Sequence, residues 1–312
     1  MVKRKSSLAS TEKVRVRFLV ELLHGSVIDV IPDMFCVFCR SFGGNEMSAH
    51  LIERQFTRIG ARAKVRPWAL RDRASGVSID IRRDSEGEYF DFSVPQDQAI
   101  ETQVLDVQPS LRHLLLMSKQ IDGKHKFLCG HDERHWFVAA IPERAAVSTV
   151  KTAFEALKPV AVRRLEYRLG VKPRKRNRRR NDAFTRQGEW FFVPVPEGVV
   201  VEEKLILKNE PISRGGGKPH VCEEVVRQGG LLVYISSQYP NGLTEMQRMQ
   251  LISRRPELRH LHWIAQRRNP TVFVRGRVRH PDHKTIVLDG WHHVLMNTET
   301  ESMAMRHVAF ID

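Results

Sequence analysis

A run of basic residues near the middle of the chain constrains the fold more than any other segment. Residues 172–180 read Lys-Pro-Arg-Lys-Arg-Asn-Arg-Arg-Arg, with seven positive charges in nine positions. Burying such charges without partners would cost several kcal/mol each, so the run must face solvent or a phosphate-bearing partner. We therefore predict a basic linker or arm over residues 171–187, between two folded parts of the chain.

The length and the pattern of the chain favour two mixed domains. A chain of 312 residues is longer than one hydrophobic core usually serves. Residues 13–170 alternate between strand and helix patterns without a regular βαβ rhythm, whereas residues 188–312 resemble a series of strands. We predict an α+β fold with an N-terminal mixed domain over 13–170 and a β-rich C-terminal domain over 188–312, and a flexible tail over residues 1–12.

Several local patterns predict individual elements. Apolar spacing predicts helices over 47–59, 107–119 and 147–157. Residues 77–81 and 89–94 predict two strands that the turn 84–87 joins. Thr244 is a suitable N-cap for a helix over 244–253.

The charge balance indicates a polyanionic partner. The chain has 51 Lys and Arg against 36 Asp and Glu, which gives a formal net charge of +15. A field of this sign attracts the phosphate backbone of DNA or RNA. No apolar run reaches the roughly 18 residues of a membrane span, and no signal-type segment follows the basic N-terminus. Four cysteines do not form a disulfide framework, so we expect a cytoplasmic protein without a membrane partner.

Three segments supply the cations that we expect to contact nucleic acid. The first is the basic run, the second flanks the glycine-rich loop 215–217, and the third alternates along one predicted strand and so shares a face. These residues are Lys172, Arg174, Lys175, Arg176, Arg178, Arg179 and Arg180; Arg214 and Lys218; and Arg275, Arg277 and Arg279.

Histidines gather near the C-terminus. Pro281-Asp282 is turn chemistry, so His280–His283 is expected to form the tip of a loop. Asp289-Gly290 predicts a hairpin turn between strands over 284–288 and 291–296. Neutral imidazole is a common ligand of zinc and other divalent metals. We predict a divalent metal, zinc or magnesium, held by His280, His283 and His292, with Asp282 and His220 as further candidates.

The same segment resembles the HNH-type (ββα-metal) nuclease motif over about 30 residues. Asp282-His283 is similar to the opening of that motif, and Asn297 and His307 follow at comparable intervals. The resemblance implies a metal-dependent nuclease in which His283 activates water while Asp282 and His307 hold the metal. The family carries its last histidine on a helix, whereas residues 306–311 predict a strand.

Two further groups could carry chemistry. Cys36 and Cys39 have a spacing that suits zinc, although their apolar neighbours favour buried thiols. The turn 130–136 brings His131, Asp132 and Glu133 together, which suits an acid–base site or a solvated turn.

Three interpretations of function remain open. The first is a nucleic-acid-binding protein, the second a metal-dependent nuclease, and the third a non-catalytic subunit of a ribonucleoprotein or defence assembly. The sequence does not decide whether the protein is an enzyme.

Overall fold

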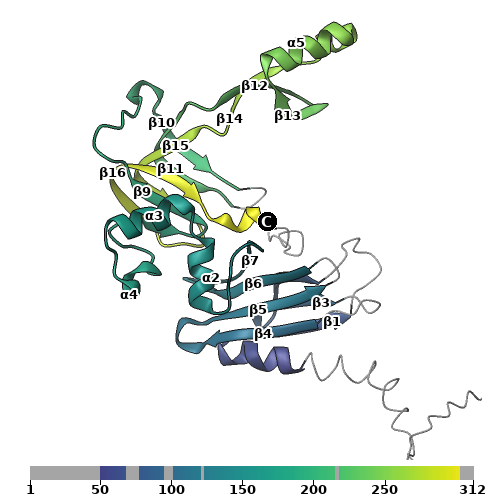
Figure 1. Cartoon of the computed structure of the whole chain (residues 1–312), viewed down its shortest axis with the longest axis vertical. Helices are drawn as coiled ribbons and strands as arrows, with labels where there is room; N and C mark the ends of the chain where they lie inside the picture. Colours follow the sequence, from purple (N-terminus) through teal and green to yellow (C-terminus); the bar gives the residue numbers. More distant parts are fainter. Residues whose placement is uncertain (1–49, 68–76, 95–100, 121–122, 215–217, 303–312) are drawn as a thin grey trace, which may run out of the picture. The chain divides into compact units, whose positions relative to one another are not determined.

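The structure is a computed structural model that describes residues 50–67, 77–94, 101–120, 123–214 and 218–302. These residues form a mixed fold of short helices and four β-sheets (Figure 1). The predicted tail 1–12, the pair Cys36 and Cys39, the loop 215–217 and His307 lie outside the described residues.

The first sheet has three strands, in the order β1-β3-β2. They are β1 (Ala63–Pro67), β2 (Ser78–Asp84) and β3 (Gly87–Val94). The predicted hairpin between β2 and β3 is confirmed, while β1 pairs with β3 in parallel. A helix over 50–58, also predicted, buries Ile52 and Phe56 in the core that this sheet shares with the second sheet.

The second sheet is an antiparallel meander that is buried on both faces. Its strands are β4 (Glu101–Gln108), β5 (His113–Gln120), β6 (Gly123–Asp132) and β7 (His135–Ile141), and η2 (Pro109–Leu111) precedes β5. Leu114 and Leu116 enter the core of the first sheet, and Leu115 enters a second core. The helix predicted over 107–119 is therefore wrong. Burial on both faces removes the polar alternation that would have marked β5 as a strand.

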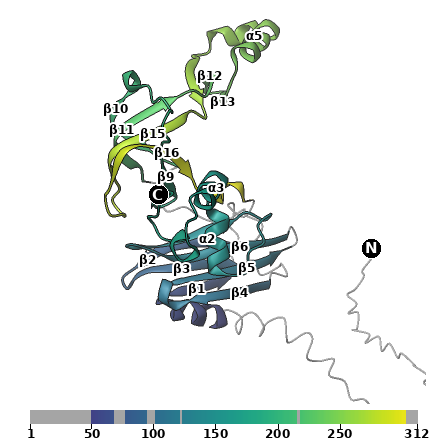
Figure 2. The same cartoon turned by 60° about the vertical axis from the view of Figure 1, so that its left-hand side comes forward.

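Three helices follow the meander. They are α2 (Val150–Leu157), α3 (Val160–Arg168) and α4 (Pro173–Arg176). The predicted helix α2 is confirmed: Thr149 and Thr152 form a capping box. The helix lies against the meander (Figure 2), where Val150 and Ala153 are buried in the second core. Residues 173–176, expected to be part of a solvated linker, form the single turn α4.

A six-stranded sheet in the order β10-β11-β15-β16-β9-β8 follows in the chain. Its strands are β8 (Thr185–Gln187), β9 (Trp190–Pro194), β10 (Leu207–Ile212), β11 (His220–Gln228), β15 (Thr271–Arg279) and β16 (Ile286–Met296). Two 3-10 turns flank it, η3 (Glu203–Leu205) and η5 (Thr298–Glu301). One face of the sheet buries Phe192, Val225, Val274 and Leu288.

The hairpin of this sheet lies earlier than predicted. Asp289-Gly290 is not a turn, because both residues lie inside the continuous strand β16. Gly290 has a φ of +82°, and the register between β15 and β16 shifts beside it. The positive φ that glycine allows is therefore used in an irregularity of the strand pairing rather than in a turn. The connection between the two strands is the loop 280–285, whose tip the sequence predicted.

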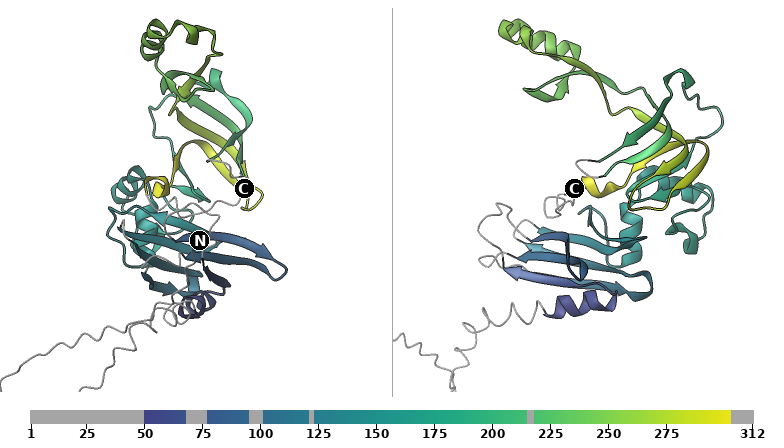
Figure 3. Two further views of the ribbon diagram at one scale, coloured as in Figure 1. Left: turned by 90° about the vertical axis from the view of Figure 1, so that its right-hand side faces the viewer. Right: turned by 180° about the vertical axis from the view of Figure 1, so that it is seen from behind.

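Residues 229–270 form an insertion between the paired strands β11 and β15. This insertion contains β12 (Leu231–Ser236), β13 (Tyr239–Leu243), α5 (Glu245–Arg254), η4 (Pro256–His260) and β14 (Ile264–Arg268). Its sheet has the order β13-β12-β14, and α5 begins at the predicted cap Thr244. The helix and strands of the insertion are drawn in green in Figure 3. Of the helices in the described ranges, none is long and apolar enough to cross a membrane.

Candidate metal centre

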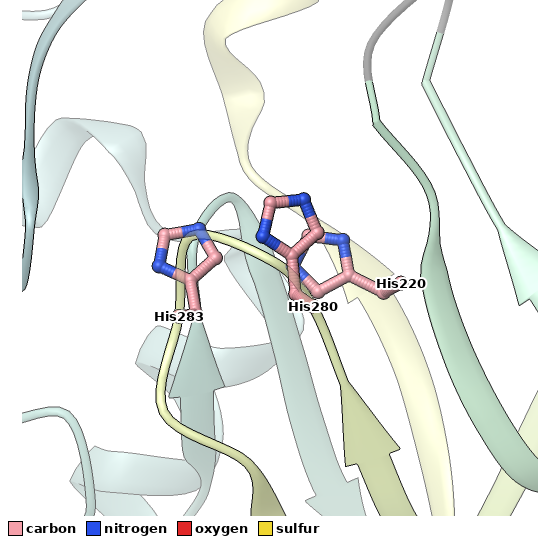
Figure 4. A group of neighbouring side chains, drawn as sticks. All are labelled: His220, His280 and His283. Carbon is pink, nitrogen blue, oxygen red and sulfur yellow. The ribbon is translucent and has the colours of Figure 1, made fainter.

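Three histidines from two segments of the chain meet beside the β15–β16 loop. His220 opens β11, and His280 and His283 lie in the loop (Figure 4). Each of the three offers one ring nitrogen that lies within 4.8 Å of a ring nitrogen of the other two. The ring centroids are 4.2 Å apart for His220 and His280, and 4.7 Å apart for His280 and His283. We call these three residues the histidine triad.

The pairing of β11 with β15 explains why the triad forms. Val221 lies opposite Arg279 in this antiparallel pair. His220, which precedes Val221, and His280, which follows Arg279, are therefore neighbours at the same edge of the sheet. His220 and His280 are therefore held together by strand register. His283 comes back towards them because the loop turns at Pro281 and Asp282.

Burial leaves ring nitrogens of the triad without partners. His220 is 1% exposed, and within the described residues neither of its ring nitrogens forms a hydrogen bond. The Nδ1 of His283 likewise forms no hydrogen bond there. Burial, reinforced by the neighbouring histidines, lowers the pKa of His220 to about 3, and burial also lowers the pKa of His283. The neutral imidazole that results is the form that binds a metal.

His280 differs from the other two members of the triad. The backbone N–H of Asp282 donates to its Nδ1 at 3.1 Å, and its Nε2 lies 3.2 Å from the carbonyl oxygen of Lys218. Coordination through His280 would replace one of these contacts. Three nitrogens on one zinc ion lie about 3.4 Å apart, so the triad would also have to close by about an ångström.

Gly188 makes room for the imidazoles. It lies in the turn between β8 and β9 with a φ of +56°. A Cβ at this position would lie 2.9 Å from Nε2 of His283 and 3.4 Å from Nε2 of His220. Both the backbone conformation and the space therefore require glycine. Gly188 was not among the predicted site residues, although a glycine between a short strand and an aromatic run is a turn signal.

Carboxylates and a fourth histidine surround the triad. Asp282 pairs with Lys218 at 3.1 Å and with Nε2 of His135 at 3.3 Å. Nδ1 of His135 lies 2.5 Å from Glu88 on β3. Glu133 lies 3.8 Å from Nδ1 of His283. The turn 130–136, which the sequence offered as a separate acid–base candidate, thus contributes to the surroundings of the triad.

The triad borders two cavities. One, of about 300 Å³, is lined by Asp282 and His283 together with Asn297, and by basic side chains from the segment 176–186. The other, of about 880 Å³, is lined by His220, His280 and Lys218. These volumes are large enough to admit a nucleotide-sized group or several water molecules.

Two residues predicted for the site lie apart from the triad. His292 belongs to β16, and its Nδ1 contacts the carbonyl oxygen of Gly290 at 3.0 Å. A turn at Asp289-Gly290 would have brought His292 back to the loop 280–285. Because β16 continues through these residues, His292 instead lies along the strand, away from that loop. Asn297 caps η5 and hydrogen-bonds to Glu299, although it lines the same cavity as His283.

The basic run contains both paired and unpaired cations. Arg179 pairs with Asp132 and Glu133, and Arg176 donates to the carbonyl oxygen of Val171. Four other side chains of the run are exposed and form no ion pair or hydrogen bond with any described residue. They are Lys172, Arg174, Arg178 and Arg180.

The predicted cations outside the basic run already have partners. Nε of Arg275 lies 2.6 Å from Glu224, and Nε of Arg277 lies 3.2 Å from Glu223. Arg279 donates to the amide oxygen of Asn209. Likewise, Arg214 pairs with Glu299, and Lys218 pairs with Asp282.

The chain matches no protein-family model, no curated protein and no solved structure.

Proposed function

We propose that this chain is a cytoplasmic nucleic-acid-binding protein. One observation carries the proposal: cations of the basic run line the same cavity as Asp282 and His283. Arg176 and Arg178 both contribute to that lining. A phosphate backbone that the exposed cations attract would be held next to the histidine triad.

The unpaired cations carry most of the expected affinity. A cation without a carboxylate partner releases a counterion from the phosphate backbone when it binds, whereas a paired cation first has to lose its own partner. Lys172, Arg174 and Arg178 belong to the first kind, and Arg275 and Arg277 to the second.

Salt-dependent binding tests the proposal. The full chain is titrated with a labelled oligonucleotide at several salt concentrations, alongside K172Q/R174Q/R178Q and the matched triple variant R275Q/R277Q/R279Q. Each lost phosphate contact should reduce the slope of log K against log salt by about 0.7 to 0.9. We expect this slope to fall by about two in K172Q/R174Q/R178Q and by less than one in R275Q/R277Q/R279Q. Equal slopes in the wild type and the first variant would remove the basic run from the interface.

A metal-dependent nuclease is the second candidate, and the triad favours it. Three neutral imidazoles beside a cavity leave one side of a tetrahedral ion open for water. A bound divalent ion would lower the pKa of that water and polarise a phosphate oxygen. Asp282 and His135 lie next to the triad and would orient or accept the proton.

Metal titration separates the two candidates. The full chain is stripped with a chelator and titrated with zinc against a competing indicator dye. We expect one equivalent to bind, H283A to weaken this binding by at least tenfold, and H292A, a histidine outside the triad, to leave it unchanged. If H283A binds zinc as the wild type does, the triad is not a metal site.

Turnover decides between chemistry and binding alone. A nuclease cleaves an oligonucleotide in the presence of zinc, magnesium or manganese and loses cleavage in H283A. Binding without cleavage in each of these metals would instead favour a binding protein or a non-catalytic subunit of a ribonucleoprotein or defence assembly.

A further inference from the structure

We propose that the outer face of α3 is a binding surface for single-stranded nucleic acid, with Tyr167 as a stacking platform for a base. This inference rests on the proposed nucleic-acid-binding function and names the substrate class and a second contact surface. Tyr167 is 83% exposed, the largest exposed fraction among the large apolar and aromatic side chains of the described residues. Arg163, Arg164 and Arg168 surround it on the same short helix.

The inner face of α3 is firmly anchored, so the outer face has a fixed direction. Val162 is fully buried against Phe184 and Phe191. Glu166 is 2% exposed and accepts a hydrogen bond from Nζ of Lys158 at 2.9 Å. A rigid helix presents an aromatic ring at a low entropy cost, which a flexible loop could not do.

Helical spacing places the exposed residues together. Arg163 and Tyr167 are four residues apart, as are Arg164 and Arg168, so each pair shares one side of the helix. A phosphate held by one arginine therefore lies within a nucleotide's length of the tyrosine ring. Interleaved aromatic and basic side chains are the arrangement by which single strands are bound without sequence preference.

The positive charge on this face has no ion-pair partner among the described residues. Arg163, Arg164 and Arg168 form no ion pair with any residue that the structure describes. The one acidic residue of the helix, Glu166, is buried and bound to Lys158 on the other side. Arg164 and Arg168 therefore repel each other at helical spacing, and a bound phosphate would relieve that repulsion.

The surface continues towards the proposed interface. Exposed, unpaired cations follow α3 in the chain at Lys172 and Arg174, and Arg178 lines the cavity beside the triad. Figure 1 shows α3 and α4 as neighbouring helices of one segment. A strand bound along α3 thus has a continuous run of cations that leads to the cavity.

The exposed ring favours single strands over duplexes. A base in a duplex is already stacked on its neighbours and cannot lie on an external ring without being unstacked. An unpaired base has a free face and gains the full stacking interaction.

The test compares two substitutions of the same exposed residue. The full chain, Y167L and Y167F are titrated with a labelled single strand of about 20 nucleotides and with a duplex of the same length. We expect Y167L to weaken single-strand binding on the order of tenfold, and Y167F, which keeps the ring, to stay within about twofold. Duplex binding should not change in either variant. Because the side chain is so exposed, circular dichroism should show the same fold in all three proteins.

A second pair of variants tests the arginines. R164Q/R168Q should reduce the salt slope of single-strand binding by about one to two. R54Q/R58Q removes two exposed arginines from the helix over 50–58 and should leave the slope unchanged.

The outcomes distinguish this inference from the proposed function. If Y167L binds the single strand as tightly as the wild type, and that binding still depends on salt and on the basic run, the α3 surface is overturned and the proposed function stands. If the wild type binds neither oligonucleotide, both fail.

Discussion

Two buried histidines show how a structural imidazole differs from a candidate ligand. Burial lowers the pKa of His113 to about 4 and that of His220 to about 3. Nδ1 of His113, however, contacts the carbonyl oxygen of Leu111 at 2.5 Å, and its ring packs on Phe137 and Phe154. His220 has no such hydrogen bond within the described residues, and its ring faces two other imidazoles. An unsatisfied, neutral nitrogen is the feature that makes His220 available to a metal.

Gly188 should be indispensable for the triad. In G188A the new methyl group would press on Nε2 of His283, and the φ of +56° would strain the alanine backbone. G170A, at a φ of +61° with nothing described within 4 Å of its Cβ, supplies the strain without the contact. We expect G170A to lose about 1 kcal/mol of stability from the backbone strain and G188A to lose more, and only G188A to lose zinc affinity. Equal zinc affinity in the two variants would contradict the role given to Gly188.

His113 should make the stability depend on pH. The unfolded chain binds a proton at this residue near pH 6.5, whereas the folded chain does so only near pH 4. Its contribution is therefore fully present above pH 6.5 and is lost as the pH falls towards 4. Moving from pH 7 to pH 5 should cost about 2 kcal/mol at this site, a cost that H113Q should not show. Urea unfolding of both proteins at the two pH values measures the difference, and an identical loss in H113Q would refute it.

At the scale of elements, a buried ion pair fastens α3 to the end of α2. Lys158 and Glu166 are 3% and 2% exposed, and Nζ lies 2.9 Å from the carboxylate. Asn181 donates a further hydrogen bond to Glu166 at 2.9 Å. This network holds the helix whose outer face we propose as a binding surface.

Removing one partner of this pair should cost far more than removing both. E166L leaves the buried charge of Lys158 with Glu155 as its main acidic partner, and we expect a loss of about 3 kcal/mol or more. K158M/E166L replaces both charges by apolar side chains and should recover most of that loss. Chemical denaturation of the three proteins gives the comparison. A double variant no more stable than E166L would show that the pair itself, rather than the unpaired charge, dominates.

Local signals in the sequence identified elements best where one face is polar. The capped helix α2, the cap of α5 and the β2–β3 hairpin all have such signals, and all three are confirmed. Local sequence signals were least informative where tertiary contacts determine the structure. β5 is buried on both faces and resembled a helix, and Gly290 resembled a turn but belongs to a strand with an irregular register.

Across the whole molecule, the site combines residues that lie far apart in the sequence. Four segments contribute, around residues 133–135, 188, 220 and 280–283. The sequence could predict the loop and its histidines, because turn chemistry is local. It could not select His220 over His292, since that choice depends on which strands pair and in which register.

The positive charge behind the net value of +15 is unevenly distributed once the ion pairs are known. Arg275 and Arg277 of β15 pair with acids on β11, whereas the arginines of α3 and most of the basic run form no ion pair with the described acids. A sequence supplies the number of charges but not their pairing. Of the predicted cations, the structure therefore favours those of the basic run over those of β15 for the proposed interface, and it adds the arginines of α3.

Photocrosslinking tests this central claim most directly. A photoreactive phenylalanine analogue is placed at Arg178, which lines the cavity beside His283, or at the exposed Val200 as a control. The full chain is then irradiated with a labelled single-stranded oligonucleotide at about physiological salt. We predict a strong crosslink from position 178 that an unlabelled oligonucleotide competes away, and little or none from position 200. Efficient binding with no crosslink at position 178 would contradict the account.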